Sequence, residues 1–324
     1  MTPCDIPAVD LPGNQTLGRR TRLWIGVAVL FLWAALAARP AVAQSAPADP
    51  TPQATLSAGA VETGGTLLVQ LDCRRMPASA GDLRVSFYNQ DIKIFPHPVK
   101  GQAVYAGLVG VPLTAPSGKT ALTIEWGSAA QRFAKNVPFE VRPGVYGEET
   151  LTVDPRHVRP SPKELERIKR EQEELKHIYA SGSRSRLWQG GFQIPVPGEM
   201  NGAFGTRRLF NGELQSHHTG ADFRAQAGDP VHAAGSGVAR LAKDLFYSGN
   251  AVIIDHGAGV FTSYSHLSRI DVKVGQKIEK GQAVGLVGAT GRATGPHLHW
   301  AVKVNSVNVN PLTFVRVMDL LAGS

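Results

Sequence analysis

The sequence predicts a mostly β protein with a β-sandwich-like domain first, then a helical connector, then an antiparallel β-sheet domain. Three observations support this prediction. Short runs of alternating apolar residues, separated by Gly, Pro, Ser and Asn turns, fill residues 54–143. One segment, residues 161–180, has helical periodicity, and glycine-rich hairpins follow from about residue 186. With 324 residues, 43% hydrophobic and 19% charged, the chain is long enough for two ordinary domains.

The first 43 residues have the anatomy of a secretory signal peptide. Three arginines between residues 19 and 22 precede an apolar run over residues 23–38, and the small residues 41–43 follow as a cleavage site. A membrane anchor is the alternative, but the run is short for one and lacks a clean polar flank. The arginine pair leaves twin-arginine export open beside the general route. We expect an exported protein of the periplasm or cell envelope, with no stable membrane span after signal cleavage and a flexible spacer over residues 44–53.

Charge and cysteine content limit the partners and the chemistry. The formal net charge is +8, and removal of residues 1–43, which hold four arginines and two aspartates, leaves +6. A basic exported protein is attracted to anionic envelope polymers, whereas nucleic acid is not expected as a partner outside the cytoplasm. The mature chain keeps one cysteine, Cys73, which excludes a disulfide within it and is typical of a small buried hydrophobe.

The predicted sandwich, residues 54–143, carries no recognisable chemistry. Its strands include "TLLVQLDC", "LRVSFYN" and "AVYAGLVGV", and the segment has no acid pair, metal cluster or nucleophile with a base. We therefore expect it to act as a spacer or to bind a glycan or a partner protein.

The connector, residues 144–185, contains a well-marked helix. Ser161 is its N-cap, Pro162 occupies the first helical position and Glu164 the capping-box position. One apolar stripe runs along it, made of Leu165, Ile168, Leu175 and Ile178. This pattern predicts a helix docked by one face. A coiled coil with a partner is the alternative, but the segment is shorter than three heptads.

The last segment, residues 186–324, concentrates the histidines. Seven of the ten histidines lie between His217 and His299, which indicates a site rather than a random surface distribution. In "HHTGADF", His218 and Asp222 flank a glycine that permits a tight backbone path. In "HLHW", strand alternation places His297 and His299 on one face and the apolar residues on the other. In "FTSYSHL", Tyr264 and His266 share a strand face.

Imidazole and carboxylate groups are good zinc ligands, and three protein ligands with one open position define a catalytic zinc site. His218, Asp222 and one histidine of the HxH pair would make such a set. The remaining histidines would serve proton transfer and charge stabilisation. A closed structural site usually uses thiolates, and residues 186–324 contain no cysteine.

Five segments together resemble the M23 family of metallopeptidases, the lysostaphin-type or LytM-like peptidoglycan endopeptidases. They are "GAFGTRRLFNG", "HHTGADF", "AVIIDHGAGVFTSYSHLS", "VGQKIEKGQAVGLVGATGRATGPHLHW" and "NVNP", and they span about residues 201–311 in the family's order. The resemblance implies a compact antiparallel β-sheet peptidase domain with a groove and one Zn2+ per chain. It implies that the zinc is held by His218, Asp222 and His299.

The same resemblance assigns the other site residues. His266 and His297 become the catalytic pair that activates water and stabilises the oxyanion, and Tyr264 lines the groove as a substrate-binding residue. It implies an exported zinc metalloendopeptidase that cuts peptide cross-links of peptidoglycan, at the D-alanyl to diaminopimelate bond. An envelope regulatory protein is a further partner that the resemblance allows.

Two alternatives remain open from the sequence. Some relatives lose the ligands and act as non-catalytic activators of cell-wall amidases, but such a protein should lack His218, Asp222 or His299, and none is missing here. In the second, the connector helix or the sandwich covers the groove until a partner moves it.

Overall fold

The computed structural model describes residues 51–76 and 82–323, and over these the fold is mostly β, as predicted. The predicted signal peptide and most of the predicted spacer lie outside the described residues. Neither helix of the described residues combines the length and the hydrophobicity that a membrane-spanning segment requires. The described residues form one compact unit, so the domain boundaries within it stay predictions.

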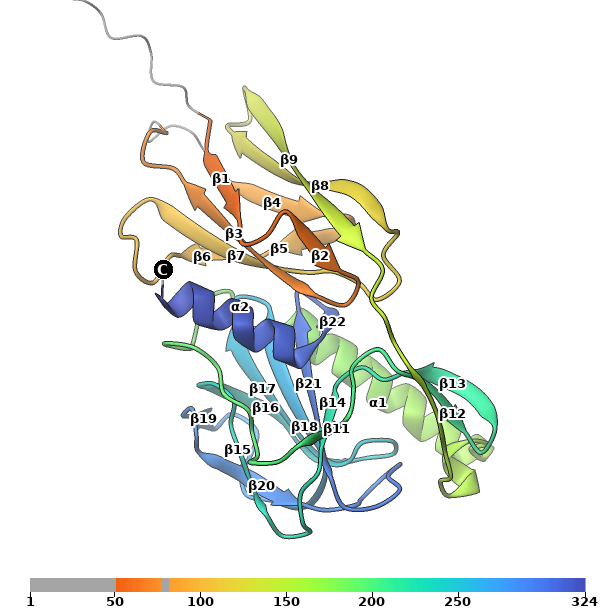
Figure 1. Ribbon diagram of the computed structural model, residues 1–324. Coiled ribbons are helices and arrows are strands. Elements are labelled where there is room, and N and C mark those ends of the chain that lie inside the picture. Colours follow the sequence, from red (N-terminus) through yellow and green to blue (C-terminus); the bar gives the residue numbers. More distant parts are fainter. Residues whose placement is uncertain (1–50, 77–81, 324) are drawn as a thin grey trace, which may run out of the picture. The chain divides into compact units, whose positions relative to one another are not determined.

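The N-terminal part contains two β-sheets (Figure 1). The first has the order β1 (Gln53–Leu56), β3 (Thr66–Asp72), β7 (Val104–Gly110) and β6 (Ile94–Pro96). The second has the order β2 (Ala60–Glu62), β9 (Arg132–Arg142), β8 (Gly118–Gly127), β4 (Arg84–Phe87) and β5 (Gln90–Ile92). Apolar residues of both sheets form one buried cluster, including Leu71, Ile124 and Phe139. Cys73 is buried in the same cluster and forms no disulfide among the described residues.

A ten-stranded sheet forms the C-terminal part. Its main order is β11 (Met200–Gly202), β14 (Ala221–Phe223), β21 (Leu298–Val304), β18 (Val260–Ile270), β17 (Gly249–Gly257), β16 (Gly237–Leu245) and β19 (Lys277–Ile278). Three short strands extend it, namely β15 (Pro230–His232), β20 (Ala283–Val287) and β22 (Val307–Val309). Helix α2 (Pro311–Gly323) contributes Phe314 and Met318 to the core that Leu298 and Trp300 of β21 share.

The connector helix is α1 (Pro162–Ala180), and its N-terminus has the predicted capping box between Ser161 and Glu164. Ile178 packs with residues of β16, β17 and β18, and Ile168 is also buried. The first residue of the predicted apolar stripe is not buried, however, because Leu165 is 53% exposed. Burial of the helix starts only at Ile168, one turn further on.

The connector also contains a strand that the sequence did not indicate. β10 (Glu148–Leu151) pairs in parallel with β12 (Arg207–Phe210), which pairs in the antiparallel sense with β13 (Glu213–His217). The register sets Glu149 opposite Arg208. A connector residue thereby reaches the neighbourhood of the histidine cluster.

Candidate metal centre and active site

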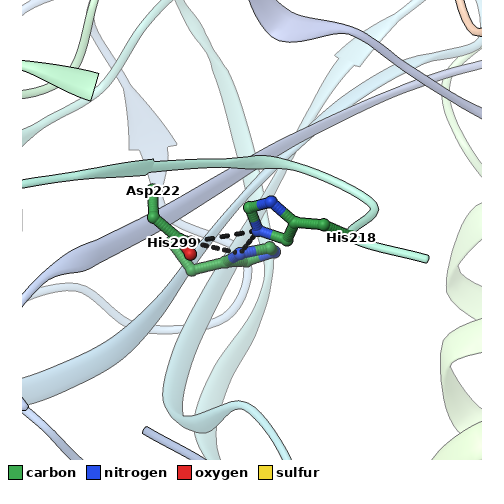
Figure 2. A group of neighbouring side chains, drawn as sticks. All are labelled: His218, Asp222 and His299. Carbon is green, nitrogen blue, oxygen red and sulfur yellow. Dashed lines mark hydrogen bonds and ion pairs between the residues drawn. The ribbon is translucent and has the colours of Figure 1, made fainter. Parts of the chain in front are cut away.

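Three of the predicted site residues converge on one point (Figure 2). His218 Nε2 lies 3.1 Å from Asp222 Oδ1 and 2.9 Å from His299 Nδ1. The third separation, His299 Nδ1 to Asp222 Oδ1, is 2.8 Å. Each residue therefore offers one nitrogen or oxygen atom to a common centre.

Strand pairing and a close backbone approach produce this convergence. Asp222 of β14 lies directly opposite His299 of β21 in the antiparallel register, so the two side chains share a face. His218 follows β13, and its backbone N–H donates to the Thr206 carbonyl at 2.8 Å. Between the two ligand positions, a Cβ on Gly220 would lie only 2.5 Å from the carbonyl oxygen of Trp300. Only glycine lets this turn pass so close to β21.

Hydrogen bonds fix which ring nitrogen of His218 faces the centre. Its Nδ1–H donates to the Ala203 carbonyl at 2.8 Å, so the neutral ring presents a lone pair at Nε2. That lone pair faces the carboxylate oxygen of Asp222, which is also an acceptor. The group therefore requires a positive charge at its centre, either a proton on an imidazole or a metal ion.

The donor set fits a metal ion such as zinc. Two imidazole nitrogens and one carboxylate oxygen are the ligand types of catalytic zinc sites. Ligands on a tetrahedral zinc ion lie about 3.3 Å apart, close to the separations of 2.8 to 3.1 Å found here. The carbonyl of Ala203 orients His218 in the way that partners of metal-binding histidines commonly do.

Asp222 is held in its ionised form by its surroundings. Burial opposes its ionisation, but His218 and His299, which donate hydrogen bonds to the carboxylate when their rings are protonated, outweigh burial and keep the pKa of the carboxyl well below its usual range. Its second oxygen, Oδ2, accepts a hydrogen bond from Arg208 Nη2 at 2.6 Å. Arg208 in turn donates from Nε to Glu149 of β10. The connector strand thus supports the arginine that orients Asp222.

The two further histidines of the predicted site lie beside this centre. The His266 and His297 ring centroids are 4.8 Å apart, and His297 Nε2 is 3.8 Å from Asp222 Oδ1. His297 Nδ1–H donates to the Gly295 carbonyl and His266 Nδ1–H donates to the Thr290 carbonyl, each at 2.8 Å. In both neutral rings, Nε2 is left as a proton acceptor.

His266 reaches the site through an unusual backbone conformation. Its φ is +64°, in the left-handed region that non-glycine residues rarely adopt. Ser265 pairs with His299, so simple alternation would send the next side chain to the opposite, core-facing side. The left-handed residue breaks the alternation, and His266 lines the same cavity as Ser265 and His299. The pKa of His266 is lowered to about 3, mainly by burial and to a smaller extent by the charges of the nearby His299 and His297.

The expectation that Tyr264 lines the groove is wrong. Tyr264 is fully buried in the core of the C-terminal sheet, and its hydroxyl accepts a hydrogen bond from the Ala234 N–H at 2.8 Å. Thr262 Oγ1 lies 3.0 Å from the same hydroxyl, and His256 Nε2 lies 2.7 Å from Thr262 Oγ1. Tyr264 therefore belongs to a buried polar network in the core and does not line the groove.

Two adjoining cavities open onto the histidine cluster, of about 260 and 150 Å³. Both are lined by Arg208, Phe210, His266 and Arg292. The smaller one also has walls from the connector residues Glu149, Leu151 and Val153. Three residues of these walls, Arg208, Glu149 and Arg292, were not predicted from the sequence. Arg208 and Arg292 lie within the segments that resemble the M23 family, but no feature of the neighbouring sequence indicates that their side chains point into the site.

Comparison with known proteins agrees with this geometry. The model of Peptidase family M23 matches residues 216–311, a range that contains all five histidine and aspartate positions of the cluster. The crystal structure of an M23 peptidase from Pseudomonas aeruginosa is 30% identical, with 79% of this chain and 95% of that chain covered and a TM-score of 0.57. The chain belongs to peptidase family M23.

Two curated relatives match part of this M23 protein. The peptidoglycan DD-endopeptidase ShyA of Vibrio cholerae serotype O1 is 47% identical over 95 residues, which are 29% of this chain and 22% of that protein. The DD-carboxypeptidase/endopeptidase Mpg of Neisseria meningitidis serogroup B is 39% identical over 127 residues, which are 39% of this chain and 29% of that protein. This M23 chain thus spans less than a third of the length of either relative.

Proposed function

We propose that this M23 protein is a zinc metalloendopeptidase that hydrolyses peptide cross-links of bacterial peptidoglycan. The observation that carries the proposal is the convergence of His218 Nε2, Asp222 Oδ1 and His299 Nδ1 on one centre with two more imidazoles beside it. These three atoms would hold the zinc ion. The names of the curated relatives supply the substrate class.

When bound, zinc supplies Lewis-acid polarisation of the scissile carbonyl and acidifies a water molecule. The chain's own residues provide the proton transfers. In neutral His266 and His297, Nε2 remains a proton acceptor because Nδ1–H donates to a backbone carbonyl. One of them accepts the proton as the water oxygen attacks the carbonyl carbon. The resulting imidazolium then donates this proton to the leaving nitrogen as the C–N bond breaks.

His266 suits the role of a base that starts neutral. Its lowered pKa, about 3, leaves the ring uncharged at neutral pH with a lone pair on Nε2, and the same shift makes it a weaker base than an ordinary histidine. The Thr290 carbonyl holds the ring in the orientation that the transfer requires. His297 is less deeply buried and nearer to Asp222, so it is the second group that contacts the reacting atoms.

We further propose that the bond cut is a DD-bond, between D-alanine and diaminopimelate, because the two curated relatives are both named for DD-peptidase activity. The site of action would be the periplasm or cell envelope, after export through the predicted signal peptide. Peptidoglycan is then the principal partner, and an envelope protein that controls access to the groove is a second.

The test is mass spectrometry of fragments released from purified peptidoglycan by the protein. We expect new fragments whose masses name the bond cut, and we expect them to vanish with His299→Ala and after chelation and to return when zinc is restored. His232→Ala is the matched control, because His232 is a half-buried histidine of β15 outside the cluster. Fragments that persist with His299→Ala would overturn the proposal. The release of no fragments by the zinc-loaded unaltered protein would also overturn it.

A further inference from the structure

Arg292 has a fixed place beside the histidine cluster. Its backbone N–H donates to the Tyr247 carbonyl at 2.8 Å. The preceding residue, Gly291, has φ +72°, and a Cβ there would lie 2.3 Å from the Gly249 nitrogen. The loop before β21 is therefore packed backbone to backbone against the turn before β17. This contact holds the start of the Arg292 side chain in position.

Two aromatic rings fix the guanidinium group itself. Its central carbon lies 4.1 Å from the centroid of the Phe210 ring and 4.6 Å from that of the Tyr247 ring. Such stacking restrains the planar group and leaves its N–H donors at the edge free to bind an acceptor. Arg292 lines both cavities of the site, together with His266.

The charge of Arg292 has no acidic partner in residues 51–76 and 82–323. Arg208 differs in this respect, because it lines the same cavities but forms ion pairs with both Glu149 and Asp222. Burial, together with the positive charge of Arg208, lowers the pKa of Arg292, yet a guanidinium stays protonated at neutral pH. A half-buried cation without a counter-ion gains most from an anionic ligand.

We infer that Arg292 is the binding site for a carboxylate of the substrate, on the residue that leaves with the scissile nitrogen. The planar fork of a guanidinium matches a carboxylate with two parallel hydrogen bonds. The neighbouring apolar walls, from Phe210, Tyr247 and Leu151, accommodate the carbon atoms of that residue.

The identity of this carboxylate rests on the proposed function. In a DD-bond from D-alanine to diaminopimelate, the carbon attached to the scissile nitrogen carries a free carboxylate, and so it does in a terminal D-alanyl-D-alanine. A peptide bond inside a glycine bridge has no carboxylate at that carbon. Arg292 would therefore select DD-bonds over internal peptide bonds, by binding the group that distinguishes them.

The test compares two ligands that the protein cannot hydrolyse. Both are reduced-amide analogues of acetyl-D-alanyl-D-alanine, with a CH2–NH link in place of the scissile amide, and one has a free C-terminal carboxylate while the other has a carboxamide. Calorimetric titration of the zinc-loaded protein should give about ten- to a hundred-fold tighter binding of the carboxylate, because hydrogen bonds between charged groups are strong.

Arg292→Gln should bind the two ligands equally, and Arg292→Lys should keep part of the preference because it keeps the charge. Arg269→Gln is the matched control, since Arg269 is exposed and lies outside both cavities. Thermal unfolding of each variant checks that it is folded, and if Arg292→Gln is not, Arg292→Lys carries the comparison.

Equal affinities in the unaltered protein, absence of binding, or an intact preference in both Arg292 variants would overturn the inference. Failure here is distinguishable from failure of the proposed function. If the protein cleaves peptidoglycan but shows no preference for the carboxylate ligand, the inference about Arg292 is rejected and the proposed function is kept. A preference without any cleavage keeps the anion site and removes the peptidase proposal.

Discussion

The buried His256 gives a prediction about pH and stability. Its side chain is fully buried, and its Nδ1–H donates to the Ser236 carbonyl at 2.8 Å. The neutral ring therefore accepts at Nε2 from the Thr262 hydroxyl, at 2.7 Å. Burial lowers the pKa of His256 to about 4, although the hydrogen bond to Ser236 opposes the shift. Protonation would place a charge in the core and replace the acceptor at Nε2 with a donor.

The sign and size of the effect follow from the two pKa values. In the unfolded chain a histidine has a pKa of about 6.5, so between pH 6.5 and 4 the unfolded state binds a proton that the native state does not. This contribution to stability is complete above pH 6.5 and is lost as the pH falls toward 4. At 1.36 kcal/mol per pKa unit, the loss is about 2 kcal/mol at pH 5.

The assay is urea unfolding at pH 7 and pH 5, for the unaltered protein and for His256→Asn. Other buried histidines add to the pH dependence of both proteins, so their contributions cancel when the two are compared. The free energy of unfolding of the variant should fall by about 2 kcal/mol less than that of the unaltered protein between pH 7 and pH 5. His177→Asn, on the exposed side of α1, controls for the removal of a histidine. If His256→Asn and the unaltered protein lose the same free energy, the reasoning is refuted.

Two further predictions concern the metal centre. Arg208→Gln removes the hydrogen bond to Asp222 Oδ2 and should weaken zinc binding about ten- to a hundred-fold in a competition titration, whereas Arg207→Gln, an exposed neighbour on β12, should not. Equal zinc affinities of the Arg208→Gln and Arg207→Gln variants would show that the hydrogen bond from Arg208 to Asp222 does not contribute to zinc binding. Gly220→Ala forces a Cβ to within 2.5 Å of the Trp300 carbonyl and should cost about 1 to 3 kcal/mol of stability in thermal unfolding, with weaker zinc retention. Unchanged melting would contradict the close approach.

Where local patterns decided the structure, the sequence was a good guide. Alternation along β21 predicted that Leu298 and Trp300 would be buried and His299 would face the site, and the burial pattern agrees. The capping box at Ser161 defined the start of α1. These features depend on neighbours within a few residues, which the sequence displays directly.

Long-range strand pairing and strained backbone conformations could not be predicted from local sequence patterns. β10 joins β12 across more than fifty residues, so no spacing rule indicated that Glu149 would support Arg208. The assignment of Tyr264 and His266 to one strand face assumed regular alternation, and the left-handed backbone at His266 separates them. Tyr264 then belongs to the core and His266 to the site. Such a conformation is imposed by the surrounding structure rather than by the residue itself.

The glycine-rich run "GATGRATGPHLHW" explains why one loop affects several functions of the site. The Thr290 carbonyl accepts the Nδ1–H of His266 and so sets the tautomer of the proposed base. Gly291 brings the backbone against the turn before β17, and Arg292 follows, which lines both cavities and has no acidic partner within the described part of the chain. The loop ends where the His297 N–H donates to the Gly288 carbonyl, immediately before the strand that carries His299. A shift of this loop would therefore move the base, the proposed carboxylate site and a metal ligand together, so proton transfer, specificity and metal binding should change in concert.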